Sequence, residues 1–128
     1  MSTIKANTLL HSDGSTTTQP AIPALDKRMA KAWCTFDNTG TLSVHDSYNV
    51  SSITDIATGH SRTNFATALP NNNYVIVGGG DASGTNNSII RYDNAKGVRS
   101  TTSFGMRCSS IDGVSTNSAY NSVVVFGS

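Results

Sequence analysis

Glutamate is absent from this 128-residue sequence, and leucine occurs only five times. Valine and isoleucine together occur 17 times, and serine, threonine and asparagine make up 46 of the residues. Glutamate and leucine favour helices, whereas valine, isoleucine and threonine favour strands. The composition therefore argues against a helix bundle, a coiled coil and a doubly wound α/β enzyme, and it predicts an all-β fold.

Charged residues are also scarce, at 13% of the chain, with a net charge of +1. The basic residues are scattered, so no nucleic-acid partner is expected. No apolar run reaches the roughly 18 residues of a membrane span, and the first residues lack the apolar core of a secretory signal. The two cysteines, Cys34 and Cys108, match no metal-ligand spacing, and reduced thiols are expected in a protein assembled in a cytoplasm.

Short strand-like segments alternate with turns from residue 31 onward. Turn residues recur at spacings of roughly 8 to 12, which is typical of a sandwich or barrel. The expected strands are residues 32–36, 41–46, 52–56, 61–67, 73–77, 88–92, 102–108 and 120–126. The sequence thus predicts one domain over residues 31–128, an antiparallel β-sandwich of about eight short strands.

Residues 1–30 differ from the rest of the chain because they are polar and rich in turn-forming residues. Such a segment buries too little apolar area to fold alone. We expect an extended N-terminal arm that becomes ordered against a partner, with a flexible tail as the alternative. The apolar residues available for anchoring are Ile4, Leu9, Leu10 and Ile22.

Two segments, residues 74–77 and 123–126, are apolar without alternation. One face of an antiparallel sheet usually contacts water, so an apolar second face suggests that another subunit covers it. The strand edges are protected by neutral polar residues rather than by lysine or proline, which also favours a closed symmetric oligomer over a monomeric sandwich. The candidate subunit-interface residues are Val123, Val124, Val125 and Phe126.

The sequence contains no motif that indicates catalysis. The glycine-rich segment 78–84 lacks the Lys-Ser/Thr of a phosphate-binding loop and precedes a strand rather than a helix. The three histidines have no metal-ligand spacing. No Gly-x-Ser-x-Gly pattern singles out one serine, so any Ser-His-Asp set would be arbitrary. We expect a protein that is not an enzyme and that holds no cofactor and no metal.

Most aromatic side chains are expected in the core, and the residues concerned are Trp33, Phe36, Phe65, Phe104 and Phe126. Tyr92 lies between Arg91 and Asp93 at a strand end. An aromatic ring beside polar groups is suited to binding a saccharide, because the ring covers the apolar face of the sugar. Tyr92 is therefore the best exposed aromatic candidate, against the alternative of a tyrosine at the rim of the core.

The order of several short segments resembles the C-terminal module of tail-fibre and related virion proteins of tailed bacteriophages, of the podophage and cyanophage type. These segments are Ala30–Trp33, Phe36, Asp46–Ile53, Asn64–Phe65, Ala68–Pro70, Asn73–Tyr74 and Ser122–Gly127. Residues 2–9 are similar to the virion-anchoring N-termini of phage fibres. The resemblance implies a β-rich homotrimer in the virion, attached to other tail or capsid proteins through residues 1–30.

If the strands alternate in direction, the turns after every second strand point away from the arm, toward a host surface or its glycans. Within the turns 37–40, 57–60, 78–87 and 109–117, the candidate receptor-facing residues are Asp37, Asn38, His60, Asp81, Asn86, Asn87 and Asp112. Tyr92 and the loop 93–100 then lie on the arm side, so the loop 78–87 ranks above Tyr92 as a receptor contact.

The chain departs from the resembled proteins in two respects. Cys34 stands where a β-branched residue is expected, and no long shaft precedes the module. The expected function is therefore a non-enzymatic, tail-fibre-like or tail-tip module that takes part in host attachment. The alternatives are a capsid decoration protein, which forms a knob on the head, and a free lectin-like carbohydrate-binding module.

Overall fold

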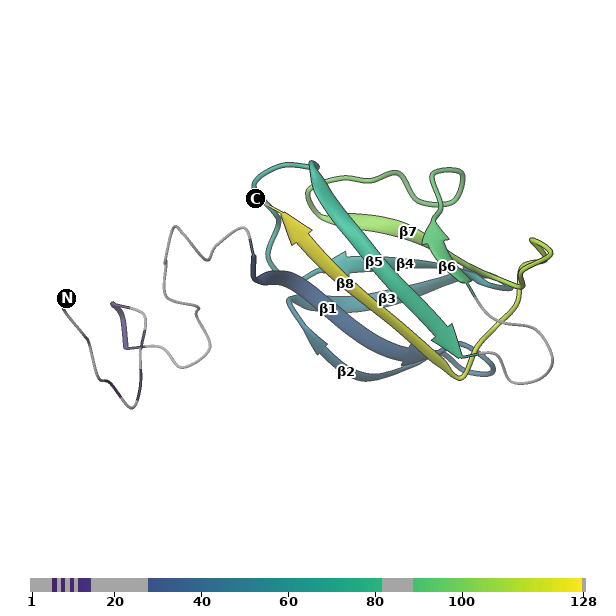
Figure 1. Cartoon of the computed structure of the whole chain (residues 1–128), viewed down its shortest axis with the longest axis horizontal. Coiled ribbons are helices and arrows are strands. Elements are labelled where there is room, and N and C mark those ends of the chain that lie inside the picture. The colour runs from purple at the N-terminus through teal and green to yellow at the C-terminus, as the bar shows by residue number, and fades with distance from the viewer. Residues whose placement is uncertain are drawn as a thin grey trace.

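The computed structural model describes residues 6, 8, 10, 12–14, 28–81 and 89–127. All regular structure in these residues is β-strand, and the strands form two four-stranded sheets that lie one over the other (Figure 1). Of the expected anchor residues only Leu10 is described, and its side chain is exposed. The predicted residues that lie outside the described ones are Ile4, Leu9, Ile22, Asn86 and Asn87.

Eight strands follow one another along the chain, and every neighbouring pair within a sheet is antiparallel. The first sheet has the order β2-β1-β8-β5 and the second has the order β3-β4-β7-β6. The strands are β1 (Ala30–Asp37), β2 (Ser43–Tyr48), β3 (Val50–Ala57), β4 (His60–Phe65), β5 (Tyr74–Asp81), β6 (Ile89–Tyr92), β7 (Ser103–Ser109) and β8 (Tyr120–Gly127). The predicted all-β, antiparallel two-sheet architecture is confirmed.

The core between the sheets is formed by the inward-pointing residues of each strand. Because side chains alternate along a strand, Ala32, Cys34 and Phe36 of β1 are all buried on one side. The rings of Phe65, Tyr74 and Phe104 pack together in the core with centroids 5.6–6.1 Å apart. Each large side chain buried in this way contributes about 1.5–3 kcal/mol. One chain therefore contains a core of its own.

Two aromatic residues expected in this core lie elsewhere. Trp33 alternates with the inward-pointing residues of β1, so its side chain is on the opposite face of the first sheet and half-buried. Phe126 lies on the same outer face, beside Val75 on β5. The prediction that both belong to the core is wrong, because both residues alternate with the inward-pointing positions of their strands.

Both cysteines are buried and neither forms a disulfide. Burial raises the pKa of the Cys34 thiol to about 11. We therefore expect iodoacetamide to leave both cysteines of the native chain unmodified at neutral pH, because the thiolate is the reactive form and both sulfur atoms are shielded. Mass spectrometry after treatment in buffer and in urea checks this. Alkylation of Cys34 in buffer at the rate seen in urea would contradict it.

The strands β1, β3, β5 and β7 all finish at one end of the sandwich, which we call the distal end (Figure 1). Hydrogen bonds join the loops there: Asn38 N–H donates to Ser118 O at 3.2 Å, and Cys108 N–H donates to Gly59 O at 2.7 Å. Ala30, where β1 begins, lies at the other end. Between β2 and β3 the chain reverses at Asn49, which has a φ of 53°. The strand directions thus alternate as predicted.

Candidate functional site

The predicted receptor-facing residues at the distal end differ in how far their side chains are exposed. Asp81 and Asp112 are exposed, and Asp37 is half-buried at the end of β1. Asn38 is only 1% exposed, because its Oδ1 accepts hydrogen bonds from Ser118 N–H at 2.7 Å and from Asn121 Nδ2 at 3.2 Å. The prediction that Asn38 faces a receptor is therefore wrong, since its side chain holds the loop before β8 against the loop after β1.

The turn before β4 places His60 at the centre of a polar cluster. Gly59 has a φ of +72°, a conformation that only glycine adopts at little cost. Its N–H donates to Asn117 Oδ1 at 2.7 Å, which ties this turn to the loop before β8. His60 then begins β4 opposite Arg107 on β7.

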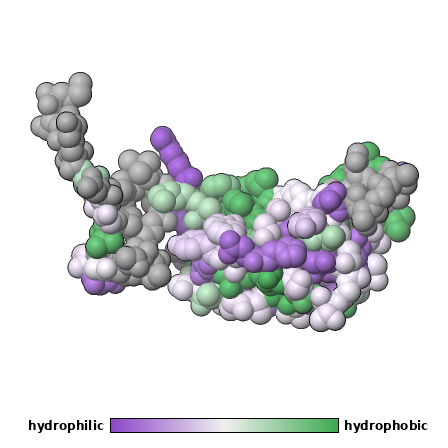
Figure 2. Space-filling view, turned by 90° about the horizontal axis from the view of Figure 1, so that it is seen from below, coloured by the Kyte–Doolittle hydropathy of each residue, from purple (hydrophilic) through white to green (hydrophobic). Residues whose placement is uncertain are grey.

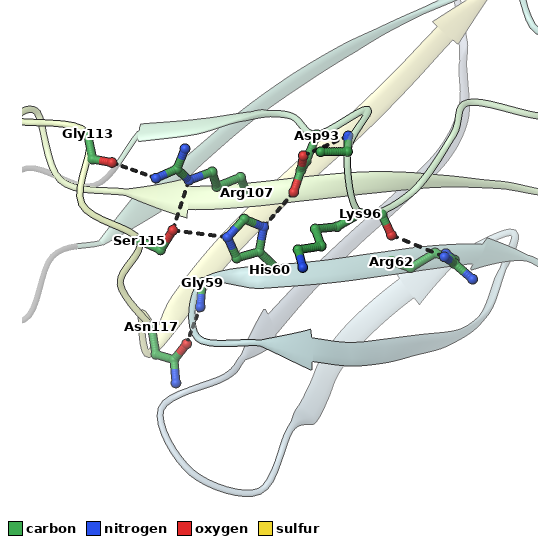
Figure 3. Close-up of polar contacts among 10 residues, drawn as sticks. Gly59, His60, Arg62, Asp93, Lys96, Arg107, Gly113, Ser115 and Asn117 are labelled. Atoms are coloured by element: carbon green, nitrogen blue, oxygen red, sulfur yellow. Dashed lines mark hydrogen bonds and ion pairs between the residues drawn. The ribbon is translucent and has the colours of Figure 1, made fainter.

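Both ring nitrogens of His60 have partners, as Figure 3 shows. Nδ1 lies 2.5 Å from Asp93 Oδ2, and Nε2 lies 3.0 Å from Ser115 Oγ. Ser115 Oγ also accepts a hydrogen bond from Arg107 Nε at 2.9 Å. Arg107 donates in addition to Gly113 O at 2.6 Å. These four side chains, His60, Asp93, Arg107 and Ser115, form what we call the His60 cluster.

Asp93 is the acidic member of the cluster, and its side chain is 9% exposed. Burial acts to raise its pKa, but hydrogen bonds from His60 and from the backbone N–H groups of Ala95 and Lys96 together outweigh it, and the pKa of Asp93 is lowered. Asp93 is therefore an acceptor-only carboxylate at neutral pH. Through His60, this carboxylate links the segment after β6 to the start of β4.

The lowered pKa of Asp93 makes stability depend on pH. A group whose pKa is lower in the folded state adds stability above its unfolded pKa, and this contribution is lost as the pH falls through the folded pKa. We expect Asp93→Asn to be less stable than the wild type near pH 6 and this difference to shrink below about pH 4. Urea unfolding at several pH values measures it. Asp112→Asn, on an exposed loop, is the control, and a constant difference for Asp93→Asn would refute the assignment.

Sequence reasoning named His60 but missed its partners. Asp93, Arg107 and Ser115 lie 33, 47 and 55 positions further along the chain (93 − 60, 107 − 60 and 115 − 60). No spacing rule joins a strand residue, Arg107, to residues of two separate loops, Asp93 and Ser115. The register of β4 against β7, which pairs His60 with Arg107, is the one signal that would have brought two of them together.

A second candidate site is the exposed surface of the first sheet. The register aligns Tyr48, Trp33, Val124 and Val77 in one row across all four strands. Val77 is 56% exposed and Val75, in the next row beside Phe126, is 61% exposed. We call Trp33, Tyr48, Val75, Val77, Val124 and Phe126 the outer apolar face.

The outer apolar face bears directly on the predicted subunit interface. Four residues were predicted to form that interface. Val123 and Val125 point into the core and are 2% and 1% exposed, whereas Val124 and Phe126 point outward. Only the second pair is available to another chain. Figure 2 views the molecule from the β2 side and shows surface hydrophobic residues in several separate groups beside a hydrophilic band.

Tyr92 is engaged within the chain. Its hydroxyl accepts a hydrogen bond from Arg99 N–H at 2.7 Å and donates to Asn94 Oδ1 at 3.1 Å. The Arg99 guanidinium lies 4.8 Å from the centroid of the Tyr92 ring and 5.1 Å from that of Tyr74. A ring covered by a cation leaves little room for a sugar on that face. Tyr92 thus orders the loop 93–100.

Among the residues that the structure describes, no group of three or more His, Cys or Asp side chains is placed to hold a metal ion. The described part of the chain also has no helix with the length and apolar character needed to cross a bilayer. Comparisons with protein-family models, with curated proteins and with solved structures give no match to this chain.

Proposed function

We propose that this chain is a structural module of a phage virion that assembles as a homotrimer through the outer apolar face. The N-terminal arm, residues 1–30, attaches the trimer to a tail or capsid protein, and the distal end faces the host surface. The role requires no covalent chemistry. It rests on the resemblance of the chain to tail-fibre modules together with the two-sheet fold.

The observation that carries the proposal is the row of apolar side chains across the first sheet. A sandwich that worked alone would place polar residues on this water-facing surface, as antiparallel sheets commonly do. A row of outward-pointing apolar side chains of this kind is typical of an interaction site. A second and third copy that bring the same face to a common axis would remove Val75, Val77 and Trp33 from water.

The directions of the strands support the orientation. β1 leads from the arm to the distal end, so the loops there lie one strand length from the attachment point. Asp81 and Asp112 are exposed at that end. Carboxylates on exposed loops bond sugar hydroxyls well, which favours a host glycan as the contact. His60 is half-buried, and both of its ring nitrogens are bonded within the chain.

Light scattering of the full-length chain tests the assembly. We expect a trimer at micromolar concentration for the wild type. Val77→Asp should give a folded monomer, because a charge within an apolar interface leaves an unpaired ion buried. Thr54→Asp, on the outer surface of the second sheet, is the matched control and should remain trimeric. A monomeric wild type would overturn the proposed assembly.

The position in the particle separates the proposed role from its alternatives. Mass spectrometry of purified tail-less heads and of whole virions should find the chain only in the whole virions. Its presence in tail-less heads would favour the capsid decoration protein. A variant without residues 1–30 that retains every function of the full chain would favour a free lectin-like module.

A further inference from the structure

The hydroxyl oxygen of Ser115 lies between His60 Nε2 at 3.0 Å and Arg107 Nε at 2.9 Å. A guanidinium has only donors, so Ser115 Oγ is the acceptor of the bond from Arg107. The serine proton is then available to His60 Nε2. The fold thus gives this hydroxyl both a neighbouring base and a neighbouring cation.

The bond to Asp93 determines which ring nitrogen of His60 carries the proton. An ionised carboxylate accepts hydrogen bonds and donates none, so the hydrogen between Asp93 Oδ2 and His60 lies on Nδ1. In the neutral ring the lone pair is therefore on Nε2, where Ser115 lies. The hydrogen bonds run in one direction, from Ser115 to His60 to Asp93.

This order of groups is the one that activates a serine for acyl transfer, and it is recognised by geometry rather than by sequence position. We propose that Ser115 is a nucleophile that small carboxylic esters acylate, with His60 as its general base and Asp93 as a positioning residue. The proposal goes beyond the structural role and does not depend on the trimer.

The reaction balances without a cofactor. Ser115 Oγ bonds to the carbonyl carbon while its proton passes to His60 Nε2, and the bond from that carbon to the leaving oxygen breaks as the leaving oxygen takes the proton. Water then adds to the acyl carbon, giving one proton to His60. The bond between the acyl carbon and Ser115 Oγ then breaks as Ser115 Oγ takes the proton back from His60, and the acid leaves. The net change is ester plus water to acid plus alcohol.

The loop that carries Ser115 also carries exposed apolar side chains. Ile111 and Val114, on the same loop, are 67% and 65% exposed and offer apolar contact to a short acyl chain. The Arg107 guanidinium stabilises negative charge that develops beside Ser115 during attack.

Peptide mapping of the full-length chain after incubation with p-nitrophenyl acetate tests the proposal. We expect acetyl groups on Ser115 and release of p-nitrophenolate. Ser115→Ala should lose both, and His60→Gln should slow acetylation of Ser115 by about 100-fold, because a general base commonly contributes that much. Ser43→Ala, at an exposed strand position, should match the wild type.

The variant Asp93→Asn tests whether Asp93 acts by orienting His60 and not by maintaining the fold. It should slow the reaction of Ser115 while the thermal unfolding curve still shows one folded state. The comparison of the wild type with Ser115→Ala decides the question: a wild type that carries no acetyl group on Ser115 and releases p-nitrophenolate no faster than Ser115→Ala would overturn the proposal. An equal rate of Ser115 acetylation in folded His60→Gln would overturn it as well, whatever the oligomeric state.

Discussion

Replacing Val125 with aspartate should leave the chain unable to fold, whereas the same change at Val124, the preceding residue, should leave it folded and monomeric. Val125 is 1% exposed in the core between the sheets, and Val124 points outward in the row with Trp33. An unpaired carboxylate at the first position costs several kcal/mol, which is comparable to the total stability of a small domain, about 5–15 kcal/mol.

Circular dichroism and light scattering of the two variants measure these outcomes. Val125→Asp should lack the β-sheet spectrum, and Val124→Asp should keep it while losing the mass of the assembly. Val124→Thr retains the shape of the side chain and serves as the control for position. A folded Val125→Asp would disprove the burial of that side chain. An assembled Val124→Asp would remove the outer apolar face from the interface.

The second large effect is expected at Gly59. A Cβ at this position would lie 2.5 Å from Cys108 O and 2.7 Å from Thr116 N, which are backbone atoms that cannot rotate away. The left-handed conformation costs an alanine about 1–2 kcal/mol, and steric overlap typically adds about 1–3 kcal/mol. Gly59→Ala should therefore lower the free energy of unfolding by about 2–5 kcal/mol.

Gly40→Ala is the matched control for this change. Gly40 also follows a threonine in a distal turn, but a Cβ there would have no atom within 4 Å. Its free energy of unfolding should stay within about 0.5 kcal/mol of that of the wild type. If Gly59→Ala unfolds at the same urea concentration as Gly40→Ala, the close contact between this turn and the strand β7 is not present in solution.

The sequence predicted the strands well because their signals are local. Inward positions such as Cys34 and Phe36 alternate with outward ones, and glycine, asparagine and aspartate mark the turns between them. The same alternation places Trp33 on the outer side of the first sheet. Alternation along β8 likewise places Val123 and Val125 inside and Val124 outside.

The His60 cluster could not be predicted from the sequence, because it depends on how loops settle against each other. Ser115 reaches His60 only because Ser110 N–H bonds Val114 O at 2.8 Å and Thr116 N–H bonds Cys108 O at 3.1 Å, which folds the loop back along β7. Such contacts depend on how the loops pack in three dimensions, and no sequence pattern in a loop indicates which other loop it contacts. Asn38 was misplaced for the same reason.

The central position of β1 determines how the module would carry a mechanical load. This strand lies between β2 and β8 and runs from Ala30, beside the arm, to the far end of the sandwich. The backbone hydrogen bonds of β1 to β2 and β8 lie perpendicular to the strand axis. Tension between the arm and a distal loop bound to the host would act along β1, so all of these hydrogen bonds would be loaded in shear together. A tether attached through β2 at the sheet edge would instead peel its bonds apart singly, at far lower force.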